Sequence, residues 1–177
     1  ADRGLGCLGV ASVGYAEQER RTAEYRRRIR QCDPVGQVVT EEVTTLNFLY
    51  CHEDLGTAAR VGMDMMGRFG VSNSHLLWTR EAYPTRAYQS LVNATPGGGA
   101  GGGTDRHGLP ESVCIGDPDR IVEVLTRWES LGLTGINFLL NAQEVIAQPR
   151  VLESMRLFAT EVMPRFRTVP APAREAG

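Results

Sequence analysis

The sequence predicts an α/β fold with parallel strands. The main reason is the order of elements in the last third of the chain, where an amphipathic helix, a short apolar strand and a second amphipathic helix follow one another. Two earlier apolar runs, near 6–12 and 43–50, are each followed by a helical segment as well. Strands that alternate with helices are typical of parallel sheets. We therefore expect three parallel strands in chain order, the third near 135–140.

The first strand and helix lie in residues 6–31. Residues 6–13 form a short apolar run with small residues at its end, as in a buried parallel strand. Residues 16–31 mix glutamates and arginines, so several i,i+4 pairs can form on an outer-layer helix. A cluster of arginines for a polyanion is the alternative function of this segment. Residues 33–36 (DPVG) predict a turn.

The second strand is the clearest in the chain. Residues 43–50 (VTTLNFLY) are β-branched and aromatic almost throughout, and Glu53 and Asp54 then begin a helix over about 53–69. Residues 71–111 break the regular pattern, and residues 97–103 (GGGAGGG) contain six glycines in seven positions. Long loops of this kind are lids, binding loops or disordered linkers, so we expect flexible or irregular chain over 95–107.

The last third has clear helix signals. Asp117 can cap a helix, Pro118 suits its first position, and Gly132 ends an apolar face that runs over 118–131. The strand at 135–140 precedes a helix over 150–163 that ends before Pro164. The residues of this last helix that we expect to point inward are Val151, Leu152, Met155, Phe158, Ala159 and Val162.

These segments also resemble a known family. GDPDRIVEVLTRWESLGLTGINFLL followed by QPRVLESMRLFATEVMPRF is similar to the C-terminal end of the luciferase-like monooxygenases, which include bacterial luciferase and alkanesulfonate monooxygenases. The resemblance continues upstream through CHEDLGTAARVG and ADRGLGCLGVAS and covers roughly 1–167. It implies the C-terminal part of a (β/α)8 TIM barrel, with about three βα units and an irregular insertion before the last strand. A whole barrel needs about 250 residues.

The resemblance also sets the expected domain organisation. Residues 1–167 would form a single domain, a partial TIM barrel in which 71–111 is an insertion or lid loop. Residues 168–177 would be a disordered tail. A small self-contained α/β domain is the alternative.

Composition excludes several classes of function. The formal net charge is −2, which argues against a general nucleic-acid or anionic-membrane surface. The chain has no lysine, so Schiff-base chemistry is excluded. The four cysteines and three histidines are scattered, and we expect no metal site. We find no signal peptide and no apolar run of membrane length, so the chain is expected to be a soluble cytoplasmic protein.

Candidate site residues follow from the barrel geometry, because active sites of such barrels lie at the C-terminal ends of the strands. His52 is the best candidate for acid–base catalysis, since histidine titrates near neutral pH. Each candidate could instead be a packed or solvated strand-end residue. The candidate cofactor or substrate contacts are Ser12, Val13, Gly14, Cys51 and Asn141.

The resemblance implies a flavin-dependent monooxygenase that uses reduced FMN and O₂ to oxygenate a small organic substrate. It implies a homo-oligomer in the full-length protein and allows a flavin reductase as partner. An oxidoreductase of the same fold that transfers hydride with the deazaflavin F420 is one alternative, and a non-catalytic α/β module is another. In the superfamily, the residues that hold the flavin phosphate come largely from earlier strands, so residues 1–177 alone are expected to be inactive and to bind FMN weakly.

Overall fold

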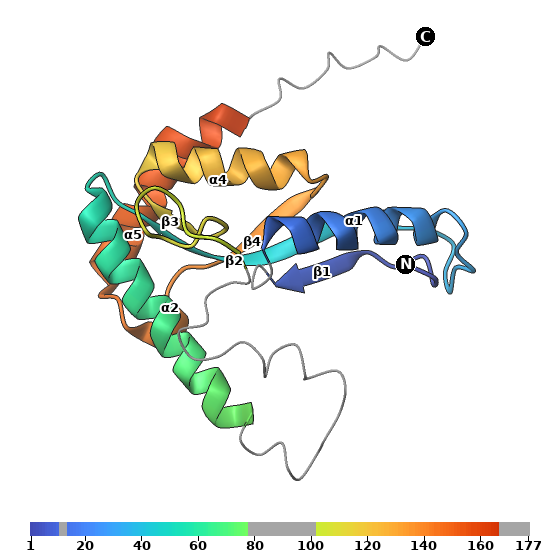
Figure 1. The fold of residues 1–177 in the computed structure, drawn as a ribbon, viewed down its shortest axis with the longest axis horizontal. Coiled ribbons are helices and arrows are strands. Elements are labelled where there is room, and N and C mark those ends of the chain that lie inside the picture. The colour runs from blue at the N-terminus through green and yellow to red at the C-terminus, as the bar shows by residue number, and fades with distance from the viewer. Residues whose placement is uncertain (11–13, 78–101, 167–177) are drawn as a thin grey trace.

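The structure is a computed structural model that describes residues 1–10, 14–77 and 102–166. It has an α/β fold with a parallel sheet (Figure 1). The strands are β1 (Cys7–Val10), β2 (Val43–Cys51), β3 (Cys114–Gly116) and β4 (Gly135–Leu139). The helices are α1 (Tyr15–Ile29), α2 (Leu55–Leu77), α4 (Pro118–Ser130) and α5 (Gln148–Leu157), with short 3₁₀ turns at Ala142–Glu144 and Met163–Phe166 and a π-helical turn at Phe158–Val162. None of the described helices is both long and apolar enough to cross a bilayer.

Strand β2 is the centre of the sheet and pairs in parallel with all three other strands. Its first half pairs with β1, from Cys7 opposite Val43 onward, and its last three residues pair with β3. β4 pairs with residues 44–48 of β2. These pairings confirm the predicted α/β fold with parallel strands.

The backbone hydrogen bonds show which edge of β2 each strand uses. Successive residues of a strand direct their backbone groups to opposite edges. The backbone oxygen of Glu42 accepts from the Cys7 N–H of β1, and the His52 N–H donates to the Gly116 carbonyl of β3. Glu42 and His52, which flank β2, are both even-numbered, so they use the same edge of that strand. The Val43 oxygen accepts from Thr134, next to β4. Thus β1 and β3 follow one another along one edge, and β4 lies on the other.

Helices cover both faces of this sheet (Figure 1). On one face, Leu49 and Cys51 of β2 pack against Ile121, Val124 and Trp128 of α4. Val43 packs on that same face against α1. On the opposite face, Tyr50 and Ile115 pack against α2. The side-chain alternation of β2 therefore divides the core into two clusters, with α1 and α4 on one side and α2 on the other.

The three predicted strands are confirmed as β1, β2 and β4. The analysis of the sequence missed β3, which has only three residues. The boundary of the second helix was wrong, because α2 continues through residues 71–77, which we had assigned to the insertion. Residues 78–101, most of that insertion, and the predicted tail at 168–177 lie outside the described residues. The flexibility predicted for 95–101 therefore stays a prediction, whereas residues 102–107 are described by the structure.

The inward face of α5 was also partly wrong. Val151 and Val162 are buried as expected, but Leu152 and Met155 are 39% and 43% exposed. Ser154 is buried instead. Its hydroxyl accepts a hydrogen bond from the backbone N–H of Cys51 at 2.8 Å, on the edge of β2 beyond the end of β4. The helix turns this hydroxyl toward the sheet because the strand-end N–H needs a partner.

Two glycines of α2 give a test of this packing. A Cβ added to Gly62 would lie 2.5 Å from Cγ2 of the fully buried Ile115, whereas a Cβ at Gly67 would meet nothing within 4 Å. Gly67→Ala should stabilise the protein by about 0.5–1 kcal/mol, because alanine favours helix. Gly62→Ala should destabilise it by about 1–2 kcal/mol, because overpacking outweighs that gain. Urea denaturation of both variants measures the difference, and a stabilised Gly62→Ala would contradict the α2–β3 contact.

Candidate functional site

The C-terminal ends of β1, β2 and β4 lie on one side of the sheet, because the three strands are parallel. Gly14 follows β1 and is the buried N-cap of α1, where its carbonyl accepts from Gln18 N–H at 3.1 Å. Ser12 and Val13 lie outside the described residues. Cys51 ends β2 and His52 follows it, and Asn141 follows β4. Each candidate that the structure describes therefore lies at or after the C-terminal end of a parallel strand.

His52 is half-buried at the junction of β2 and α2. Its Nδ1 accepts a hydrogen bond from the backbone N–H of Asp54 at 2.9 Å. Asp54 in turn caps α2, because its Oδ1 accepts from Thr57 N–H at 2.8 Å. Hydrogen bonding to the Thr57 side chain and then to its backbone holds the pKa of Asp54 below its ordinary value. The imidazole is thus oriented by the helix start, and Nε2 is the ring nitrogen left for a ligand.

Cys51 is a packed residue and not a nucleophile. Its side chain is 1% exposed within the α4-side core. Burial, followed by the charges of Asp117 and Glu161, raises the pKa of its thiol to about 12. Burial likewise raises the pKa of the Cys114 thiol. Because only the thiolate attacks an electrophile, neither of these cysteines suits covalent catalysis at neutral pH.

Asn141 closes the loop between β4 and α5. Its Nδ2 donates to the Ile146 carbonyl and its Oδ1 accepts from the Ile146 N–H, both at 2.9 Å. Inside this loop, Gln143 and Glu144 have φ values of 67° and 53°, in the left-handed region. Two adjacent non-glycine residues there cost conformational energy that the Asn141 clamp helps to offset. The structure gives Asn141 a positioning role in this loop.

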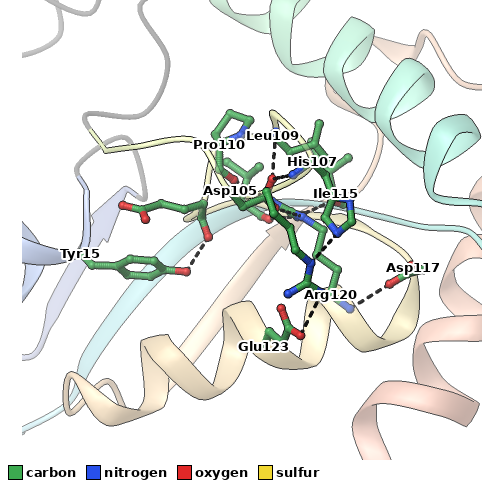
Figure 2. A network of polar contacts seen from close by, with 12 residues as sticks. Tyr15, Asp105, His107, Leu109, Pro110, Ile115, Asp117, Arg120 and Glu123 are labelled. Atoms are coloured by element: carbon green, nitrogen blue, oxygen red, sulfur yellow. Dashed lines mark hydrogen bonds and ion pairs between the residues drawn. The ribbon is translucent and has the colours of Figure 1, made fainter.

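A polar network around Arg120 holds the segment before β3 against the start of α4 (Figure 2). The Arg120 guanidinium is 3% exposed and donates to the carbonyls of Pro110, Val113 and Ile115. Its Nε donates to Asp105 Oδ2 at 2.6 Å. The predicted cap is confirmed as well, since Asp117 Oδ1 accepts from Arg120 N–H at 2.8 Å.

Asp105 is the carboxylate partner in this network. Partial burial raises its pKa, but hydrogen bonds from Arg120 and from the backbone of His107 and Leu109 outweigh burial and hold the pKa below its ordinary value. An isolated bridge between Thr104 and Pro110 closes the same segment. Residues 102–111 thus have fixed contacts although they contain no regular element longer than a bridge.

The segment before β3 also contacts α1, through residues that the sequence did not single out. The Tyr15 hydroxyl donates to the Glu111 carbonyl at 2.6 Å. Its ring meets Trp128 edge-on at 5.1 Å, and Arg127 lies over its face at 5.7 Å. Burial raises the pKa of Tyr15, so the phenol stays protonated at neutral pH. Its position directly after Gly14 was the only sequence signal for it.

The described residues contain no group of three or more side chains that could hold a metal ion. An open hollow of about 370 Å³ lies between the start of α4 and the end of α5, lined in part by Glu53, Asp117, Asp119 and Glu161. Asp117 is used as a helix cap, and Asp119 pairs with Arg165 at 2.8 Å. Asp117 and Asp119 therefore serve local structure, and His52 stays the one predicted acid–base residue.

No protein-family model and no curated protein matches this chain. Among the solved structures that share its fold are two monooxygenases. The monooxygenase RslO1 from Streptomyces bottropensis matches with a TM-score of 0.61 at 17% identity, over 93% of this chain and 43% of that one. The oxygenating constituent of 3,6-diketocamphane monooxygenase from Pseudomonas putida, a type II Baeyer–Villiger monooxygenase in complex with FMN, matches with a TM-score of 0.55 at 16% identity, over 92% and 43%. The chain spans less than half the length of either structure, and it folds like part of these monooxygenases.

Proposed function

We propose that residues 1–177 are the C-terminal part of a flavin-dependent monooxygenase of the luciferase-like superfamily. The observation that carries the proposal is the shared fold with two monooxygenases, one of them in complex with FMN. The sequence resemblance supports it independently, because it rests on the order of caps, helices and strands along the chain. Reduced FMN would react with O₂ and oxygenate a small organic substrate.

The sheet supports a place within a (β/α)8 barrel. β1, β2 and β4 are parallel and lie side by side in the sheet in chain order, with only the short β3 between β2 and β4 along the chain. In this proposal α1 and α4, which pack on one face of the sheet, form part of the outer helical layer. The segment before β3, with α2, would be the irregular insertion that covers the C-terminal end.

The candidate residues fit one wall of a flavin pocket. The Gly14 carbonyl, both functions of the Asn141 amide and Nδ1 of His52 already make local hydrogen bonds. His52 Nε2 remains for a contact with flavin or substrate. Gly14 allows a ligand to approach its backbone closely, because glycine lacks a side chain. These residues supply no set of donors for a phosphate. The proposal therefore assigns the phosphate and most ring contacts to earlier barrel strands.

In this proposal, residues of this chain have two roles. His52 would hold or deliver a proton through Nε2, with its orientation set by the Asp54 N–H. The packed strand ends around Cys51 would exclude water from the flavin. The proposed partners are a small-molecule substrate, a flavin reductase that supplies reduced FMN, and further copies of the full-length protein, in the cytoplasm.

Isothermal titration with FMN and with F420 tests this function. We expect residues 1–177 alone to bind FMN with a Kd above about 100 μM, because most cradle residues are missing, and a protein extended upstream to a full barrel to bind it with a Kd of about 1 μM. In the extended protein, His52→Gln should lower kcat by about 10²-fold with unchanged FMN affinity, as expected for an acid–base residue. His107→Gln, in the loop before β3, is the matched control.

The outcomes separate the alternatives. Tight binding of F420 without FMN binding would replace the monooxygenase with the hydride-transferring oxidoreductase. An extended protein that binds neither cofactor would favour a non-catalytic module. Micromolar FMN binding by residues 1–177 alone would show that the cofactor contacts lie within this chain.

A further inference from the structure

A second hollow, of about 310 Å³, lies between α2 and the start of α5. Its charged lining residues are Arg60 and Asp64 from α2 and Arg150 from α5. Its apolar wall consists of Val61, Val145, Ile146 and Ala147. The hollow is separate from the acidic one beside Glu53, and no predicted site residue lines it.

The two arginines of this hollow lack a carboxylate partner among the described residues, unlike most arginines of the described chain. Arg3, Arg20, Arg27, Arg28, Arg106, Arg120 and Arg165, for example, all form ion pairs. The acid of the hollow, Asp64, is already paired with Arg68 at 2.9 Å. The hollow therefore has a local excess of positive charge held on two different helices.

The start of α5 lies at the same wall, because Ala147 and Arg150 both line the hollow. Pro149 in the first turn has no N–H, and the N–H groups of Arg150 and Val151 both donate to the Ala147 carbonyl, at 2.9 and 3.3 Å. The backbone of this turn is therefore largely paired, and its contribution to the hollow is the charge of the Arg150 side chain.

A buried hydroxyl supplies the independent sign of a ligand. Tyr50 is 2% exposed, and its ring packs in the cluster that contains Ile146 and Val61. Its hydroxyl makes no hydrogen bond within the described chain, yet it is not among the fully enclosed unpaired atoms, which are Thr45 Oγ1 and Ser112 Oγ. Burial raises the pKa of Tyr50, and the charges that act on it include Arg150, Glu153 and Arg60. The geometry that relates Tyr50 to the hollow is its packing against Val61 and Ile146, which form part of the apolar wall.

We propose that Arg60 and Arg150, together with the Tyr50 hydroxyl behind the apolar wall, form a binding site for the oxyanion of a small organic ligand. Guanidinium groups bind the paired oxygens of phosphate, sulfonate or carboxylate in bidentate geometry, and a neutral phenol donates one further hydrogen bond. Val61, Val145 and Ile146 would pack against the organic part of the ligand. The site needs no group outside residues 1–177, so it stands independently of the flavin proposal.

Titration of residues 1–177 with inorganic phosphate at constant ionic strength tests the site. We expect saturable binding with a Kd of about 1 mM at pH 7. Arg60→Gln and Arg150→Gln should each weaken binding about tenfold, because each removes a charge-assisted contact. Tyr50→Phe should weaken it about threefold to fivefold with an unchanged melting temperature, because the ring stays packed. Arg156→Gln, an exposed arginine farther along α5, is the control and should leave the affinity unchanged.

Comparison of phenyl phosphate, benzenesulfonate and benzoate then identifies the kind of oxyanion. The ligand that binds most tightly identifies the preferred head group. If it also binds more tightly than the matching inorganic ion or acetate, the apolar wall contributes to binding. Phosphate binding that is equal in wild type and the Arg60→Gln/Arg150→Gln double variant would overturn the site. So would the absence of saturable binding, or equal affinity in Tyr50→Phe. These results are distinct from the FMN titration, which measures the flavin proposal.

Discussion

Arg120→Ala is expected to lower the free energy of unfolding by about 3–5 kcal/mol. The change leaves Asp105 without its buried partner and removes donors from the carbonyls of Pro110, Val113 and Ile115. Partly buried acceptors without a partner keep their full cost of desolvation. The loss is a large share of the about 5–15 kcal/mol that stabilises a typical domain. The segment that precedes β3 should then detach from α4.

Chemical denaturation followed by circular dichroism measures this loss. Arg165→Ala is the matched control, because its pair with Asp119 is exposed and exposed pairs contribute about 0–1 kcal/mol. Arg120→Lys should also destabilise the protein, since a lysine ammonium cannot reproduce the fork that reaches three carbonyls and a carboxylate. A loss below about 1 kcal/mol in Arg120→Ala would show that the network around Arg120 does not exist in solution.

Trp128→Ala is expected to cost about 3–5 kcal/mol, as for other large buried aromatic residues. Trp128 is fully buried in the core cluster between α4 and the sheet, and its ring meets Tyr15 edge-on. Its Nε1 donates to the Ser112 carbonyl at 2.9 Å. Alanine would leave a cavity at the point where α1, α4 and the segment before β3 meet, so α1 should lose protection in hydrogen exchange as well.

Trp128→Phe separates the cost of the cavity from the cost of the lost hydrogen bond, and Leu152→Ala tests which face of α5 is buried. Trp128→Phe keeps an aromatic ring, and the Ser112 carbonyl still accepts from Asn47 Nδ2 at 2.9 Å, so it should cost about half as much. Leu152→Ala, on the exposed side of α5, should cost less than about 1 kcal/mol. A larger loss of stability in Leu152→Ala than in Trp128→Phe would mean that α5 buries the face predicted from the sequence, with Leu152 inward, and not the face that is buried in this structure.

Local signals predicted most of the secondary structure. The Asp117–Pro118 start of α4 and the β-branched run of β2 were correct because caps and strand propensity act within a few residues. β3 was missed because three residues carry no periodicity. Leu152 and Met155 were placed inward because an apolar stripe normally packs, but the hydrogen bond from Cys51 N–H turns Ser154 to the sheet.

The candidate site residues stay a prediction. The strand-end rule selected Gly14, His52 and Asn141 because each follows the C-terminal end of a parallel strand. It could not show that Asn141 uses its amide to clamp the loop up to Ile146, nor that the Asp54 N–H orients the imidazole of His52. Hydrogen bonds of this kind depend on backbone angles that residue type alone does not set.

By itself the sequence determined the α/β class, the parallel strands and the resemblance to the luciferase-like monooxygenases, because hydrophobic period and helix caps are local properties of the chain. Only the tertiary structure decided that Arg120 is buried against Asp105 and that Arg60 and Arg150 line one hollow. In the sequence, each of these arginines has the pattern of an ordinary exposed helix residue. The loop before β3 folds back to give Arg120 its partners, and the packing of α2 and α5 on the sheet brings together Arg60 and Arg150, which are far apart in the chain.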